Sequence, residues 1–197
     1  MTHRCTLFIA WVCATAMSLF VMAWPASSDE FQLKYEIASP PSCTNNSGEK
    51  VLFRNIDNGR AKSAAGMAKR DETGTPIVYR FAYQRSPKPL QQFIDLHECA
   101  HHQTGDVDLP HPPRNSPEHM MNESIADCIA ALRIRDEING GKDVAFQAVE
   151  QLMQDMIKIG FPAVTMESRK ANILNCLQKN KSADAFLDGV LRHRKLK

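Results

Sequence analysis

Two histidines and a glutamate fall within five consecutive residues of this chain, His97-Glu98-Cys99-Ala100-His101. Residues four apart on a helix project from the same face, so His97 and His101 could bind one metal ion together. Zinc accepts imidazole nitrogens at about 2.0–2.1 Å, and two histidines one turn apart fill two tetrahedral positions. Glu98 is offset by one residue and would take a proton from a zinc-activated water. The pattern H-E-x-x-H therefore predicts one Zn²⁺ ion and hydrolytic chemistry.

A second helix-spaced pair, Glu123 and Asp127, follows after a proline-rich loop of about a dozen residues. The apolar residues of that segment lie mostly on another side of the helix, so a metal ion between the two helices gives the carboxylates a reason to face inwards. We expect Glu123 to be the third ligand and Asp127 to accept a hydrogen bond from a ligand histidine. His119 lies one turn before Glu123 on the same face and could assist as an electrophile or replace a ligand.

H-E-x-x-H followed by E-x-x-x-D on the next helix resembles the gluzincin metallopeptidases, in particular compact periplasmic and membrane-associated members. The residues that carry the resemblance are HECAHHQTG and Glu123-Ser-Ile-Ala126-Asp127, within residues 75–135. The resemblance implies a zinc peptidase in which the strand before the metal helix pairs with an extended polypeptide, here along residues 76–83.

The residue that would stabilise the transition state is not evident, and the candidates are His119, His111, Tyr79 and Arg114. An alternative function is a catalytically silent module in which zinc staples two helices and the cleft holds a partner peptide. Glu98 favours the enzyme, because a structural zinc site needs no base beside it. His102 points off the metal face by helical geometry, so we expect it to be a polar surface residue.

The elements that must position these residues are helical from residue 89 onwards. Apolar residues and the two histidines recur at three- and four-residue steps up to a stop at Gly105. Ser116 is a candidate N-cap of a second helix that reaches Asn139. Further helices are predicted over residues 143–159, over 166–179 and after Ser182, the last one fraying into the basic C-terminal residues.

The residues before this helical part contain strand signals. Residues 51–57 form a short strand candidate, and residues 75–84 form a better one, since a period of two places Ile77, Tyr79, Phe81 and Tyr83 on one face. Residues 61–74 have a weak pattern that fits a short helix or a loop. We therefore predict an α+β fold, with a strand-rich part (29–88), metal-site helices (89–139) and a helical part (140–197) in a single domain.

Residues 1–28 have the composition of a secretory signal peptide. A basic start is followed by about 20 uncharged residues, and Ala26 and Ser28 are spaced like a cleavage site. We expect cleavage and an exported protein, periplasmic or secreted, with no membrane attachment afterwards. An uncleaved leader would instead make the chain a membrane-anchored accessory protein.

Four cysteines follow the leader: Cys43, Cys99, Cys128 and Cys176. An even number in an exported domain predicts two disulfides, and four cysteines allow three connectivities. Helical geometry directs Cys99 and Cys128 away from the metal, which disfavours a direct bond between them and leaves Cys43 and Cys176 as the partners. The net charge is +2 with no basic stripe, so we expect no nucleic-acid partner.

Overall fold

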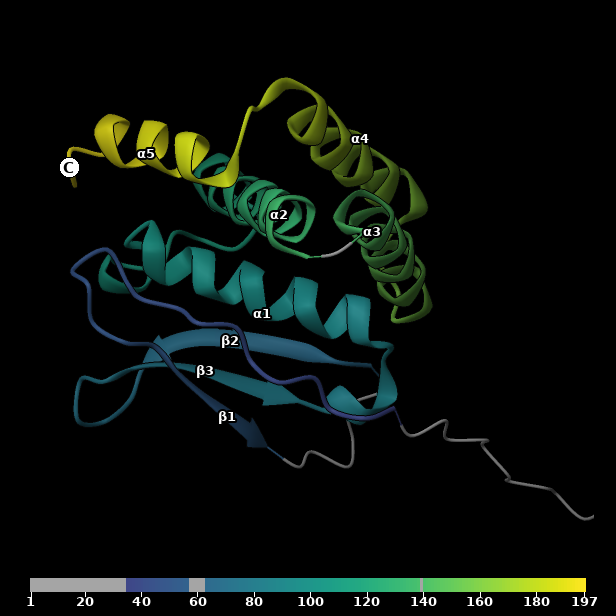
Figure 1. Cartoon of the computed structure of the whole chain (residues 1–197), viewed down its shortest axis with the longest axis horizontal. Helices are drawn as coiled ribbons and strands as arrows, with labels where there is room; N and C mark the ends of the chain where they lie inside the picture. The colour runs from purple at the N-terminus through teal and green to yellow at the C-terminus, as the bar shows by residue number, and fades with distance from the viewer. Residues whose placement is uncertain (1–34, 57–62, 139) are drawn as a thin grey trace, which may run out of the picture. The chain divides into compact units, whose positions relative to one another are not determined.

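The structure is a computed structural model that describes residues 35–56, 63–138 and 140–197, so the predicted signal peptide lies outside the described residues. The described residues belong to one compact unit. A small sheet lies in the N-terminal half and most helices lie in the C-terminal half, which confirms the predicted α+β class (Figure 1). No helix within the described residues is long and apolar enough to cross a membrane.

The sheet has three strands, β1 (Leu52–Ile56), β2 (Ala65–Arg70) and β3 (Pro76–Phe81), in the order β1-β3-β2. β1 runs parallel to β3, and β2 runs antiparallel to it. The strands β1 and β3 confirm the two sequence predictions. β2 was not predicted, because its residues lack a period-two pattern. It forms through its pairing with β3 across a turn in which the Asp71 carboxylate accepts the backbone N–H groups of Thr73 and Thr75.

The helix that carries H-E-x-x-H is α1 (Lys88–Gln103), which lies along one face of the sheet (Figure 1). A proline in its first turn suits the helix start, and Gly105 follows its end at φ +76°. Val78 and Arg80 point from β3 towards α1, whereas Tyr79 points to the opposite face of the sheet by strand alternation. The sheet therefore supports α1 from the side away from α2.

Four more α-helices follow: α2 (Pro117–Glu137), α3 (Gly141–Lys158), α4 (Ala163–Lys179) and α5 (Ala183–His193). Two short 3₁₀ helices, η1 (Tyr83–Arg85) and η2 (Asp106–Asp108), flank α1 in the sequence. Ser116 caps α2 by accepting the backbone N–H of His119 at 3.2 Å, and Ser182 caps α5 in the same way through Ala185. The main apolar core joins α1 to α2, α3 and α4 through residues such as Phe93, Ile134 and Val149. All five α-helices were predicted, and α5 ends at His193, within the basic C-terminal residues where fraying was expected.

Two disulfides connect these elements, Cys43–Cys99 and Cys128–Cys176. The first ties the segment before β1 to α1, and the second ties α2 to α4. Cys99 and Cys128 each take a different partner, as the helical geometry indicated. Both bonds start beside residues of the predicted metal site, since Cys99 follows Glu98 and Cys128 follows Asp127.

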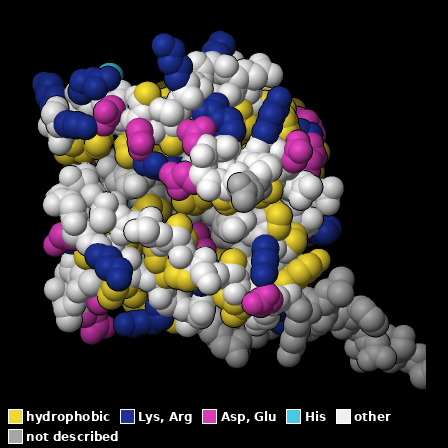
Figure 2. All heavy atoms as spheres, in the orientation of Figure 1, with side chains coloured by type: hydrophobic (Ala, Val, Ile, Leu, Met, Phe, Trp, Pro, Cys, Tyr) yellow, Lys and Arg dark blue, Asp and Glu magenta, His cyan; other side chains and the backbone are white. Residues whose placement is uncertain are grey.

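The outer surface carries dispersed charges. On the face shown in Figure 2, Lys and Arg side chains are spread over the surface with acidic side chains between them. Several form exposed pairs, such as Lys88 with Glu36 and Lys197 with Asp188. Exposed pairs of this kind contribute little to stability.

Candidate metal centre

α1 and α2 bring three potential ligands together. The Nε2 atoms of His97 and His101 lie 3.2 Å apart. Glu123 faces both rings, with Oε2 at 3.4 Å from His97 Nε2 and Oε1 at 3.5 Å from His101 Nε2. The histidine side chains are 10% and 13% exposed and that of Glu123 is 34% exposed, so the group opens to solvent at the glutamate.

These distances fit a metal ion. Two donor atoms that bind one ion tetrahedrally at about 2.0–2.1 Å lie about 3.3 Å from each other. The two imidazole nitrogens face each other at nearly that separation, and the carboxylate oxygens are only slightly farther away. His97, His101 and Glu123 could therefore hold a metal ion, as the sequence predicted.

The side chain of Glu98 extends from α1 to the edge strand β2. Its Oε2 accepts the backbone N–H of Ala68 at 2.8 Å. Gly66 makes room for this side chain, because a Cβ at that position would lie 2.8 Å from both Glu98 Oε1 and Ile94 Cγ2. The strand that the sequence did not reveal thus fixes the orientation of the predicted base.

Each ligand histidine has a carboxylate at its other ring nitrogen. Asp127 Oδ1 lies 2.9 Å from His97 Nδ1, although off the axis of the ring N–H, so the contact is an ion pair more than an aligned hydrogen bond. Asp106 Oδ2 lies 3.0 Å from His101 Nδ1. Asp127 was predicted in this role. Asp106 was not, although its place just after the glycine that ends α1 brings it back towards the last turn.

The electrostatics of the group keep its carboxylates ionised. Burial opposes ionisation of Glu123, but the charges of His97 and His101 lower the pKa of Glu123 to about 2. Burial likewise opposes ionisation of Asp127, and Arg169 and His97 hold its pKa well below the usual range. Burial disfavours the charged form of His97, yet Asp127 and Glu123 raise the pKa of its ring to about 10.

The raised pKa of His97 predicts that metal binding displaces a proton. Below about pH 10 the metal-free ring is charged, and it must become neutral to bind an ion. The apparent metal affinity should therefore rise with pH between pH 6 and 9, by up to about tenfold per unit. Competition with a chromophoric chelator at several pH values measures this rise. Asp127→Asn should flatten the slope, and a pH-independent affinity of the unmodified protein would contradict the prediction.

The remaining candidates are not among the three potential ligands. His119 and His111 have ring centroids 6.3 Å apart, and neither belongs to the three-ligand group found among the described residues. Arg114 is an exposed residue of the same loop as His111. Tyr79 lies on the sheet face away from α1 and contacts the cations of Arg54 and Lys69. The geometry gives none of them a contact with the ligand atoms.

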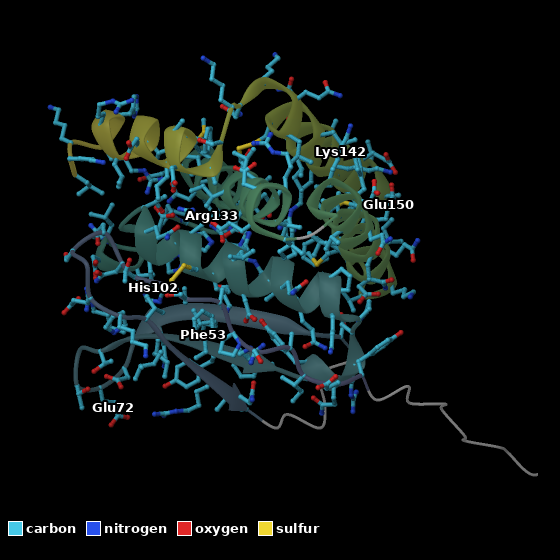
Figure 3. The ribbon with its side chains drawn as sticks, viewed as in Figure 1. Phe53, Glu72, His102, Arg133, Lys142 and Glu150 are labelled. Carbon is cyan, nitrogen blue, oxygen red and sulfur yellow. A yellow bond between two sulfur atoms is a disulfide. The ribbon has the colours of Figure 1, made fainter. Side chains whose placement is uncertain are left out.

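Two sequence expectations need correction. His102 is not a surface residue: it is 2% exposed, between α1 and the sheet, with Nε2 at 3.1 Å from the carbonyl oxygen of Ile77 (Figure 3). The strand expected to pair with a polypeptide, residues 76–83, has no free edge in β3, because residues 76–81 pair with β2 and residues 77–81 with β1. A polypeptide cannot add to the central strand of a sheet.

Comparison with known proteins gives no further guide, since no protein-family model, curated protein or solved structure matches this chain.

Proposed function

We propose that this chain is an exported zinc-dependent peptidase of gluzincin type. The observation that carries the proposal is the convergence of three ligand side chains with Glu98 beside them. His97, His101 and Glu123 come from α1 and α2, and Glu98 is held by the edge strand β2. A site that only cross-linked two helices would have no need of an oriented carboxylate next to its ligands.

The donor set and the local charge favour zinc. Two imidazoles and one carboxylate form a ligand set of catalytic zinc sites, which leave a position open for water or substrate. Four carboxylates surround the site, at positions 98, 106, 123 and 127, and two of them pair with Arg169 and Arg194. The two negative charges that remain match a divalent cation.

In this proposal Glu98 carries the proton transfer. Zinc would supply a Lewis acid that lowers the pKa of a water towards about 7 and polarises the scissile carbonyl. Glu98 takes the proton of the attacking water and passes it to the leaving amine. The hydrogen bond from Ala68 N–H to Oε2 fixes the orientation of this carboxylate.

The free edge of β2 replaces residues 76–83 as the place where an extended polypeptide would bind. β3 pairs with one side of β2, and within the described residues no strand pairs with the other. That outer edge is the one from which Ala68 reaches Glu98. Substrate pairing along it would set the scissile bond beside the base.

The experiment uses the exported form with its disulfides intact, loaded with zinc and mixed with a library of quenched fluorescent peptides. We expect hydrolysis that is lost on chelation and restored by zinc, and loss of the metal in His101→Ala and Glu123→Ala. Retained zinc without hydrolysis of any peptide would favour the silent zinc-stapled module instead. Folded protein that binds no zinc in any preparation would refute the proposal.

Gly66→Ala tests the link between β2 and the base. The added Cβ would overlap Glu98 and Ile94, so the carboxylate must move. We expect the zinc content to stay at one ion while the rate of hydrolysis falls by about tenfold or more. The matched control is Gly189→Ala, at an exposed position of α5 where a Cβ meets no atom within 4 Å, and the rate should not change.

Export is the remaining part of the proposal. Two disulfides fit an oxidising compartment and are rare in the cytosol. N-terminal sequencing of the protein recovered from an exporting host should give a chain that starts near Asp29. A chain that keeps its first 28 residues and stays with the membrane would support the anchored alternative.

A further inference from the structure

We infer that Arg169 and Arg194 are positioning residues of the metal centre, each fixing the carboxylate that orients one ligand histidine. Neither arginine touches a ligand atom, and both come from the segment after α3, a part of the chain with no other role in the site. The inference rests on the metal-binding part of the proposed function and does not depend on catalysis.

Arg169, from α4, holds Asp127 through two parallel bonds. Its Nε donates to Asp127 Oδ2 at 2.6 Å and its Nη2 donates to Oδ1 at 2.7 Å. The same Oδ1 lies 2.9 Å from His97 Nδ1. Because both carboxylate oxygens are engaged by the guanidinium fork, the Asp127 side chain cannot rotate without breaking two charge-assisted bonds. The Asp127 side chain is 3% exposed, so little water is available to replace them.

Arg194, which follows α5, holds Asp106 through one bond and also binds two neighbouring residues. Its Nη1 donates to Asp106 Oδ1 and, at 2.8 Å, to the carbonyl oxygen of Thr104. Asp106 Oδ2 accepts the Thr104 hydroxyl at 2.9 Å and faces His101 Nδ1 at 3.0 Å. The second nitrogen of the fork, Nη2, donates to Asn122 Oδ1 at 2.7 Å, next to the ligand Glu123. Arg194 thus ties the end of α1 to the start of the ligand-bearing turn of α2.

The contacts Arg169–Asp127–His97 and Arg194–Asp106–His101 have the same chemical effect. An imidazole that binds metal through Nε2 must carry its proton on Nδ1, and a fixed carboxylate there selects that tautomer and the ring orientation. Other arginines also join these helices but do not lead to a ligand. Arg133 pairs with Glu137 and Asp184, and Arg135 donates to backbone carbonyls at the end of α4. Helix packing alone therefore does not account for where Arg169 and Arg194 point.

The test compares zinc affinity in Arg169→Gln and Arg194→Gln with two matched controls. Arg133→Gln removes another α2 ion pair, and Arg192→Gln removes an exposed arginine two residues before Arg194. We expect about 10- to 100-fold weaker zinc binding in the two test variants, and less than about threefold change in the controls. Arg169→Lys keeps the charge but loses the fork, so its affinity should fall between Arg169→Gln and the unmodified protein.

Two further readouts separate positioning from a merely structural role. The visible spectrum of the cobalt(II)-loaded protein reports ligand geometry, and it should shift in the test variants and not in the controls. Urea unfolding of the metal-free proteins measures stability independently; the Cys128–Cys176 bond joins α2 to α4 in every variant. Variants that lose stability but keep the zinc affinity and cobalt spectrum of the controls would overturn the inference. If the unmodified protein binds no ion, the proposed function itself fails.

Discussion

Glu98→Gln is expected to slow peptide hydrolysis by about 10²- to 10⁴-fold while zinc stays bound. Glutamine has nearly the same shape as glutamate, and its amide oxygen can still accept the N–H of Ala68 that holds Glu98 at 2.8 Å. It cannot take a proton from water, so the change removes the proposed base and little else. Initial rates on the best library peptide, together with the metal content, measure both expectations.

The control for Glu98→Gln is Glu118→Gln, which changes an exposed glutamate in the first turn of α2. Its rate should stay within about twofold of that of the unmodified protein, since an exposed first-turn charge contributes only about 0.3–1 kcal/mol to the helix. Equal rates in Glu98→Gln and Glu118→Gln would remove Glu98 from the mechanism. Loss of zinc in Glu98→Gln would instead mean that this residue helps to hold the ion.

Asp95→Asn is expected to lower the free energy of unfolding by about 3 kcal/mol or more. Arg80 and Asp95 form a buried pair, 3% and 0% exposed, with Nε–Oδ1 and Nη2–Oδ2 distances of 3.0 and 2.9 Å. The hydroxyl of Tyr83 donates to the same carboxylate at 2.8 Å. Removing the negative charge leaves the guanidinium buried without its counterion. Urea unfolding with the disulfides intact gives the change directly.

Two controls isolate the buried charge as the cause. Asp184→Asn removes the partner of Arg133, but the Asp184 side chain is 79% exposed, so the loss should be below about 1 kcal/mol. The double variant Arg80→Leu with Asp95→Leu removes both charges and should recover much of the lost stability. Similar losses in Asp95→Asn and Asp184→Asn would show that the buried pair does not stabilise the attachment of α1 to the sheet.

The ligand set follows from sequence because it depends on local geometry. The four-residue spacing of His97 and His101, and of Glu123 and Asp127, fixes a common helix face whatever the rest of the chain does. Two such faces joined by a short loop have few ways to pack. The start of α2 and the end of α1 could also be predicted from local sequence, because Ser116 caps the first and Gly105 follows the second.

What the sequence did not show depends on contacts between distant segments. Helical geometry correctly predicted that His102 points away from the ligands. It did not predict that the sheet covers that side of α1 and buries the side chain. β2 exists because β3 offers it a partner, and its small residues Gly66 and Ala68 matter only once Glu98 lies over them. Arg169 in α4 and Arg194 just after α5 are single arginines, and no spacing in the sequence connects them to Asp127 and Asp106, which lie 42 and 88 positions earlier.

X-ray absorption at the zinc edge, on protein with both disulfides formed, tests the central claim most directly. The predicted result is one zinc per chain bound by two imidazole nitrogens and oxygen at about 2.0–2.1 Å, with the signal lost in Glu123→Ala. No stoichiometric metal in the unmodified protein, or zinc that persists with an unchanged spectrum in Glu123→Ala, would contradict the assignment of His97, His101 and Glu123 as the metal centre.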